Sequence, residues 1–442
     1  MNRVIPLDAY LRQLDRVRPI RVNGKVTKVV GLTIESQGPA VKIGDVCKIE
    51  GSQGDESMLA EVVGFRENKV LLMPFNDLGS IGPGHEVVAT GDSLRIPVGP
   101  HLLGRILDGL GNPIDGKGPL VSHERTPAIQ SPPNPLLRKR IEEPLSVGVR
   151  CIDSLLTVGC GQRVGLFAGS GVGKSTLLGM IARNTEADIN VIALIGERGR
   201  EVREFIEKDL GPEGLARSVV VVATSDQPAL VRLKGAMVAT AIAEYFRDQG
   251  QNVMLMMDSV TRFAMAQREV GLAVGEPPTT RGYTPSVFAM LPRLLERAGT
   301  GVKGTITAFY TVLVDGDDMN EPIADAVRGI LDGHIVLNRS LANRGHFPAI
   351  DVLASVSRVM NDLVTPEHRE AANKLKRLAS VYKDSEDLIN IGAYTKGSNM
   401  LIDRAIQQYP AIQQYTAQGT HEPSDLTTAS SLLVEKFGGI PV

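Results

Sequence analysis

The chain has 442 residues, of which 43% are hydrophobic and 22% are charged, which predicts a folded protein of two or three domains. Lys and Arg total 48 against 50 Asp and Glu, Trp is absent, and aromatic residues make up only 4%. Proteins that bind nucleic acid usually have a basic excess and aromatic platforms for bases, so we expect no nucleic-acid partner.

The cysteines and the start of the chain indicate a compartment. Cys47, Cys151 and Cys160 form no CxxC pair and have no His at metal-binding spacing, which predicts buried free thiols. The first residues lack the apolar core of a signal peptide, and no run reaches the roughly 18 apolar residues of a membrane span. We therefore expect a cytoplasmic protein.

The first predicted elements are a short helix and a β-barrel. Residues 1–20 carry apolar side chains at helical spacing, which fits either a helix packed on its own domain or a docking segment. Residues 21–96 contain short β-type runs separated by Gly, Asn and Asp turns, which predicts a small β-barrel. The Gly- and Pro-rich stretches "GRILDGLGNPIDGKG" and "TPAIQSPPNPLLRKR" then predict loops.

A central α/β domain is predicted over residues 97–350. From Gln162 to about Ser340, buried strand-like runs such as "RVGLFA" and "NVIALIG" alternate with amphipathic helices. This alternation predicts a mainly parallel sheet, with ligands at the carboxyl ends of its strands. After Asp351 the strand-like runs stop, and residues 351–442 read as a smaller helical domain.

The stretch "AGSGVGKST" fits a phosphate-binding loop, although Ala168 stands where the strict motif has Gly. Its glycines turn backbone NH groups toward phosphates, and the following helix offers its positive end. Lys174 would reach the β- and γ-phosphates of ATP, and Ser175 would bind Mg²⁺. The predicted nucleotide-binding residues of the loop are Gly169, Ser170, Gly171, Val172, Gly173, Lys174, Ser175 and Thr176.

Two carboxylates follow predicted strands. Asp258 ends the apolar run "NVMLMMD", the usual place for a residue that holds the magnesium shell. Glu197, in "GERGRE", follows another strand and could activate a water molecule, while Arg198 could neutralise charge on the γ-phosphate. A surface ion pair at a helix start explains Glu197 and Arg198 about equally well from spacing alone.

A resemblance to a known family favours the catalytic interpretation of Glu197 over the surface ion pair. Three motifs together, "AGSGVGKST", "GERGRE" and "PAIDVLASVS", resemble the rotary ATPase α/β family, whose members combine a β-barrel, a RecA-like nucleotide domain and a helical domain. The blocks Asp258–Gly299 and Asp317–Arg339 are most similar to the flagellar export ATPases, homologues of the type III secretion ATPases. The resemblance covers nearly the whole chain.

The resemblance implies specific roles. Lys174, Ser175 and Asp258 would hold phosphate and Mg²⁺, and Glu197 would be the catalytic carboxylate. Arg358, in "SVSR", matches the arginine that a neighbouring subunit extends to the γ-phosphate, and Phe347 stands where the family has an aromatic against the adenine. A surface cation and a core aromatic remain the plainer alternatives for these two residues.

The resemblance also implies an assembly. It predicts a homohexameric ring that hydrolyses ATP at the inner face of the membrane export apparatus and delivers unfolded export substrates, with their chaperones, to the export gate. The segment 1–20 would bind a stator-like regulator, and the helical domain would face a central coiled-coil stalk.

Other interpretations stay open. The catalytic subunit of a proton-translocating ATP synthase shares these nucleotide residues, but its acidic lever run is missing from "YKDSEDLINIGAYTKGSNMLIDRAI". An RNA translocase would need aromatic and basic residues in its barrel. A non-hydrolysing ring subunit would lack Glu197, and a type III secretion ATPase outside the flagellum differs by few residues.

Overall fold

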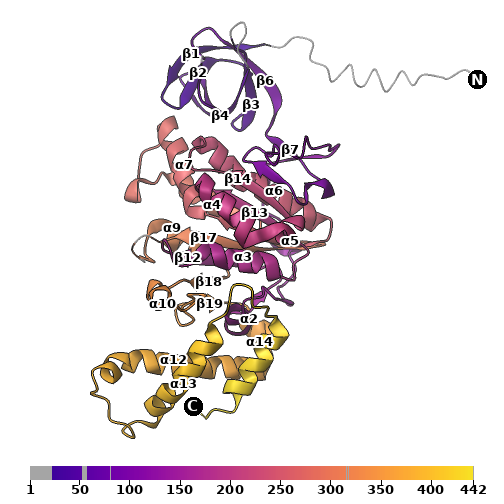
Figure 1. Ribbon diagram of the computed structural model, residues 1–442. Coiled ribbons are helices and arrows are strands. Elements are labelled where there is room, and N and C mark those ends of the chain that lie inside the picture. The colour runs from indigo at the N-terminus through magenta and orange to yellow at the C-terminus, as the bar shows by residue number, and fades with distance from the viewer. Residues whose placement is uncertain (1–21, 52–56, 80, 315, 317, 442) are drawn as a thin grey trace, which may run out of the picture. The chain divides into compact units, whose positions relative to one another are not determined.

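The computed structural model describes residues 22–51, 57–79, 81–314, 316 and 318–441, and its fold is drawn in Figure 1. These residues form two compact units. The first ends at Leu94 and includes Ala273–Gly275; the second holds Arg95–Leu272 and the chain from Glu276 onward. The predicted docking segment 1–20 lies outside the described residues, and the predicted boundary at residue 350 stays a prediction.

The first unit is a closed β-barrel, as the alternating sequence predicts. Its strands are paired in the order β1-β2-β5-β4-β3-β6, and β6 pairs again with β1. Side chains such as Val26, Ile34, Cys47 and Leu72 fill the interior. The strands are β1 (Gly24–Val30), β2 (Thr33–Gln37), β3 (Asp45–Ile49), β4 (Met58–Arg66), β5 (Lys69–Pro74) and β6 (Glu86–Ser93).

The second unit is built on a nine-stranded sheet with the order β19-β18-β12-β17-β15-β13-β14-β8, and with β16 paired to β17. All pairs from β18 to β8 along this order are parallel, which confirms the predicted α/β class. The strands are β8 (Ile106–Asp108), β12 (Arg163–Ala168), β13 (Ile189–Ile195), β14 (Ser218–Ala223), β15 (Asn252–Asp258), β16 (Gly299–Thr300), β17 (Thr305–Leu313), β18 (Gly333–Val336) and β19 (Val356–Ser357).

Helices cover both faces of this sheet, because every residue of β13 and β14 is buried although their side chains alternate between faces. The helices of this region, with their flanking turns, are α2 (Arg150–Leu155), α3 (Lys174–Asn184), α4 (Gly199–Glu204), η3 (Phe205–Leu210), α5 (Gly211–Ala216), α6 (Ala229–Asp248), α7 (Val260–Val274), α8 (Pro285–Leu295), α9 (Pro322–Ile330), α10 (Arg339–Asn343) and α11 (Met360–Leu363).

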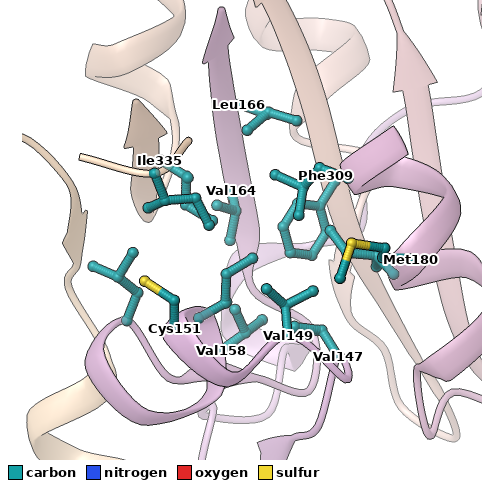
Figure 2. Close-up of a cluster of buried hydrophobic side chains, with 14 of the residues drawn as sticks. Val147, Val149, Cys151, Val158, Val164, Leu166, Met180, Phe309 and Ile335 are labelled. Carbon is teal, nitrogen blue, oxygen red and sulfur yellow. The ribbon is translucent and has the colours of Figure 1, made fainter. Parts of the chain in front are cut away.

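A hydrophobic cluster fixes the position of β12. Val147 and Val149, just before α2, and Cys151 in its first turn pack with Val164 and with neighbours from α3, β17 and β18 (Figure 2). These side chains are almost completely buried, so each contributes roughly 1.5–3 kcal/mol by leaving water. The cluster therefore holds the strand that leads into the predicted phosphate loop.

The C-terminal region is helical, as predicted. Helices α12 (Pro366–Asn390) and α13 (Met400–Thr416) pack together, and the rings of Tyr382 and Tyr409 stack between them at 3.5 Å. Two further helical segments, α14 (Leu426–Leu433) and the π-helix η6 (Val434–Gly438), follow α13 and are not predicted from the sequence. In the described part of the chain, no helix combines the length and the apolar character needed to cross a bilayer.

Some predicted loops are wrong. The Gly-rich stretch "GRILDGLGNPIDGKG" contributes β8 to the edge of the sheet, and β9 (Arg125–Pro127) pairs with β7 (Arg95–Pro97). Strand β19 likewise lies beyond Asp351, where we expected none. These strands have two or three residues, too few for the period of two to appear in the sequence. Cys47, Cys151 and Cys160 are free thiols, and Cys160 is only partly buried.

Candidate active site

The loop between β12 and α3 has the backbone of a phosphate cradle. Gly171 (φ 77°) and Gly173 (φ 90°) both lie in the left-handed region, which other residues adopt with strain. Helix α3 begins at Lys174 directly after Gly173, so its free NH groups and positive end point out of the sheet edge. The side chain of Val172 packs in the hydrophobic core, which leaves only its backbone for a ligand.

Three charged side chains from three elements meet beside this loop. The Nζ atom of Lys174 lies 2.5 Å from Oδ1 of Asp258 and 3.5 Å from Oε1 of Glu197. Asp258 is buried at the end of β15, and its Oδ1 also accepts a hydrogen bond of 2.7 Å from the Thr311 hydroxyl. One ammonium group therefore faces two carboxylates, which leaves the second carboxylate incompletely neutralised.

This imbalance perturbs the acid–base properties of the group. Burial and the nearby charge of Asp258 raise the pKa of Glu197 to about 7, although Lys174 opposes the shift. Burial disfavours the charged form of Lys174, but Asp258 and Glu197 outweigh it, so the pKa of Lys174 is raised. Glu197 thus exchanges protons near neutral pH while Lys174 stays charged.

Lys174 and Glu197 line a cleft of about 630 Å³ at the carboxyl ends of the strands, where ligands bind in open α/β sheets, whereas the buried Asp258 is not among the residues that line it. Most of the predicted loop residues take part in it. The cleft is lined by Ala168, Gly169, Ser170, Gly171, Gly173, Lys174, Ser175, Thr176, Gly196, Glu197, Arg198, Glu201, Ser225, Arg262, Leu313 and Val314.

Two arginines lie in the cleft in different ways. The Arg198 side chain is 80% exposed and donates to Oε1 of Glu201 at 2.9 Å, so it stands at the rim. Arg262, which the sequence analysis misses, packs its aliphatic stem against Gly196, where an added β-carbon would come within 2.8 Å of it. Its buried Nε atom has no hydrogen-bond partner among the described residues, and it comes from the first turns of α7, just after Asp258.

The structure does not bring every predicted site residue together. Arg358 is exposed, follows β19, and is not among the described residues that line the cleft. Phe347 is 45% exposed and lies beside the loop, with its Cδ1 atom 3.5 Å from the position of a β-carbon built on Gly173. Its ring is therefore available to a ligand held by the loop.

Comparison with protein families gives matches along most of the chain. Residues 26–91 match the β-barrel domain of the ATP synthase alpha/beta family, and residues 148–357 match its nucleotide-binding domain. Residues 364–435 match the T3SS EscN ATPase C-terminal domain. The barrel, the sheet and the helical region each correspond to one of these matches.

Individual proteins match over nearly their full length. The flagellum-specific ATP synthase of Bacillus subtilis is 66% identical, covering 94% of this chain and 95% of that protein. The type 3 secretion system ATPase of Xanthomonas euvesicatoria is 53% identical, with 96% of each chain covered. The assembled ATPase EscN of the enteropathogenic E. coli type III secretion system superposes with a TM-score of 0.89 at 50% identity, covering 94% of this chain and 100% of EscN.

Proposed function

This chain belongs to the ATP synthase alpha/beta family, within its flagellar and type III secretion branch, and we propose that it works as a homohexameric ring with a catalytic site at each subunit boundary. It is an ATPase of protein export. The observation that carries the catalytic proposal is the placement of Lys174 between Glu197 and Asp258 at the mouth of the phosphate loop.

In this proposal the loop holds the ATP phosphates through its NH groups and Lys174. Mg²⁺, when bound, would neutralise phosphate charge. The Ser175 hydroxyl and the Asp258 carboxylate fit this ion, which commonly takes one or two carboxylates together with phosphate oxygens. No cluster of three or more metal-binding side chains occurs in the part of the chain that the structure describes, as expected if phosphate supplies the remaining ligands.

Glu197 orients the attacking water and accepts its proton, because its raised pKa makes the ionised carboxylate a stronger base than an ordinary glutamate. Arg262 stabilises charge on the γ-phosphate through the cleft-facing part of its guanidinium, with Arg198 at the rim as a second cation. Phe347 stacks on the adenine.

Arg358 belongs, in this proposal, to the site of the neighbouring subunit. Its exposure on the surface, away from the cleft of its own chain, supports that role. A cation supplied in trans stabilises transition-state charge and is worth roughly 10³–10⁵ in turnover in other nucleotide hydrolases.

The remaining partners follow from the resemblance. EscN has been solved assembled and in complex with its central stalk EscO, at a TM-score of 0.87 to this chain, which supports a stalk partner here. We propose a cytoplasmic ring, peripheral at the export apparatus, that receives substrates and chaperones and passes substrates to the gate. The match of residues 364–435 to the T3SS EscN domain favours export over proton-coupled ATP synthesis.

The first test is the magnesium-dependent ATPase rate per chain across protein concentration, with no other protein present. A rate that climbs cooperatively as chains associate supports one sequence supplying both Glu197 and Arg358. A flat, near-zero rate would mean that a second kind of subunit, or a missing partner, completes the site. A non-motile deletion strain without filaments would in turn assign the chain to the flagellum.

Sharing of the site between subunits has a sharper test. Chains with Glu197→Gln and chains with Arg358→Ala should each be nearly inactive, but mixed rings contain boundaries with both residues intact. Restored turnover in the mixture supports the shared site, whereas two variants that stay inactive together would contradict it.

A further inference from the structure

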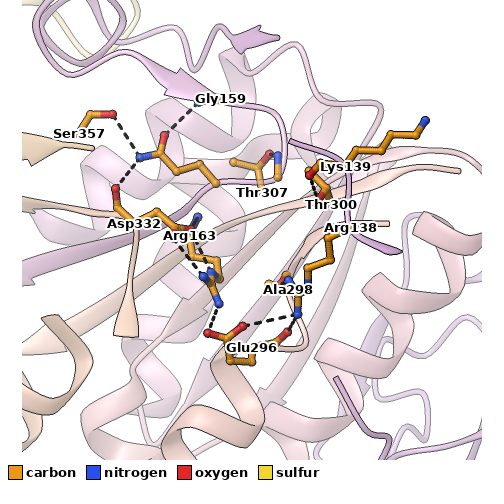
Figure 3. Close-up of polar contacts among 12 residues, drawn as sticks. Arg138, Lys139, Gly159, Arg163, Glu296, Ala298, Thr300, Thr307, Asp332 and Ser357 are labelled. Carbon is orange, nitrogen blue, oxygen red and sulfur yellow. Dashed lines mark hydrogen bonds and ion pairs between the residues drawn. The ribbon is translucent and has the colours of Figure 1, made fainter. Parts of the chain in front are cut away.

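A buried glutamine lies beneath the segment that carries Arg358. Gln162 is fully buried just before β12, where an amide without partners would be costly. Its Oε1 atom accepts from the backbone NH of Gly159 at 3.0 Å. Its Nε2 atom donates to the hydroxyl of Ser357 at 3.2 Å and to the backbone carbonyl of Asp332 at 3.1 Å, contacts drawn in Figure 3.

These contacts hold the backbone on both sides of the peptide between Ser357 and Arg358. The Arg358 NH donates to the same Asp332 carbonyl at 3.1 Å, so that oxygen joins Gln162 and Arg358. The Ser357 hydroxyl donates in turn to the backbone carbonyl of Thr157 at 2.8 Å. Among the residues that the structure describes, the exposed guanidinium of Arg358 makes one long contact, 3.4 Å to the Arg328 carbonyl. The backbone is therefore fixed while the charged group remains available.

Asp332 is itself held by the first residue of β12. Its carboxylate accepts hydrogen bonds from the backbone NH, Nε and Nη2 of Arg163, at 3.0–3.1 Å. Gly333, the next residue, has no room for a side chain, because an added β-carbon would lie 2.6 Å from the Val356 carbonyl and 3.1 Å from Nε2 of Gln162. The contact between Gln162, β18 and β19 thus has little freedom to shift.

We propose that Gln162 is a positioning residue for Arg358, so that β12 serves two catalytic sites. Its carboxyl end enters the phosphate loop of its own subunit, and its amino end fixes the arginine presented to the next subunit. This inference rests on the proposed role of Arg358. It predicts a defect that appears in the neighbour's site and leaves the site of the altered chain intact.

The first test is Gln162→Ala. We expect turnover to fall about tenfold with the KM for ATP within about twofold, because a misplaced charge weakens the transition state more than the bound nucleotide. The matched control is Thr307→Val. It removes the buried hydroxyl that accepts a hydrogen bond of 2.8 Å from the NH of Gly161, the residue before Gln162, but it leaves the hydrogen bonds of Ser357 and Arg358 in place. Equal turnover in the two variants would overturn the proposal.

Mixed rings separate positioning from a general structural effect. Gln162→Ala chains mixed with Glu197→Gln chains should regain activity, since about a quarter of the boundaries in random rings pair an intact cleft with a correctly held arginine. Gln162→Ala chains mixed with Arg358→Ala chains should regain none. The reverse pattern would place the defect in the cleft of the altered chain and overturn the proposal.

The mixture of Glu197→Gln with Arg358→Ala chains is measured alongside. If that mixture stays inactive, the shared site itself has failed, independently of Gln162. If Gln162→Ala does not fold, Ser357→Ala removes the same hydrogen bond at a partly exposed position and should give the same two mixing results. A Ser357→Ala chain with unchanged turnover would then count against positioning.

Discussion

Charged side chains are paired differently at the two ends of the parallel strands. At the carboxyl ends, Lys174 faces two carboxylates and the Nε atom of Arg262 has no partner among the described residues. At the amino ends, Arg163 donates three hydrogen bonds to Asp332, and its Nη1 atom forms an ion pair of 2.5 Å with Glu296, although that atom makes no hydrogen bond of regular geometry among the described residues. The Arg138 guanidinium donates to the backbone carbonyls of Glu296 and Ala298 (Figure 3). Burial opposes the charge of Arg163, but these carboxylates outweigh it and raise its pKa.

This difference in charge pairing separates the residues that can take part in catalysis from those that stabilise the fold. Charged side chains that are already paired within the chain are not available to bind a ligand, and their hydrogen bonds fix the backbone around them. A charge that is incompletely neutralised, such as that of Glu197, can exchange a proton near neutral pH and can interact with phosphate or metal. The carboxyl ends of the strands, here called the reactive edge, thus differ from the amino ends, here called the supporting edge. Four experiments test that division.

The largest effect is expected at the reactive edge. Glu197→Gln should lower turnover about 10³-fold, because it removes the proton acceptor, while ATP affinity stays within a few-fold. Steady-state hydrolysis and titration calorimetry with ATP measure the two quantities. Glu204→Gln, which changes a half-buried carboxylate on α4, is the control. A Glu197→Gln enzyme within a few-fold of the wild type would exclude the catalytic role.

At the supporting edge we expect a loss of stability instead. Asp332→Asn removes a charged partner from three hydrogen bonds of Arg163 and should lower the free energy of unfolding by about 2 kcal/mol. Glu207→Gln, which breaks an exposed pair with Arg203, should change the free energy of unfolding far less, because solvent screens exposed ion pairs. Urea denaturation measures the free energy of unfolding of both variants. Equal losses of stability would contradict a special supporting role for Asp332.

The pH dependence sharpens the reactive edge. Because the pKa of Glu197 is raised to about 7 and the ionised form accepts the proton, activity should be lost as pH falls through 7. The kcat/KM for ATP should rise about tenfold between pH 6 and pH 8. The residual activity of Glu197→Gln should lack this rise, and a flat wild-type profile would reject the assignment.

The smallest effect concerns binding alone. Phe347→Ala should raise the KM for ATP about fivefold by removing a stacking surface, with kcat little changed. Phe347→Tyr retains the ring and serves as the control. A fall in kcat with an unchanged KM would place Phe347 outside the adenine site.

The sequence predicts the reactive edge better than the supporting one. The phosphate loop, Asp258 and Glu197 follow apolar runs at places that strand topology makes adjacent, so short motifs reveal them. Arg262 is missed because it lies inside an amphipathic helix pattern, although its position just after Asp258 is a usable signal. The pairing of Arg163 with Asp332 joins residues 169 positions apart, and no local pattern announces it.

Secondary structure shows the same limit. Long apolar runs such as Ile189–Ile195 and Asn252–Asp258 are recognised as strands from their composition. Ile106–Asp108 is a strand only because β14 lies beside it, so the pairing, rather than the propensity of its Gly-rich surroundings, decides its conformation.

The short strands at the margins of the sheet have a consequence for unwanted pairing with other polypeptides. An exposed strand edge invites a foreign segment to pair with it and seed aggregation. Here the sheet terminates in three-residue β8 and two-residue β19, and the barrel closes on itself. These margins offer too little free backbone for a foreign polypeptide to pair with, which protects the sheet from serving as a template for aggregation.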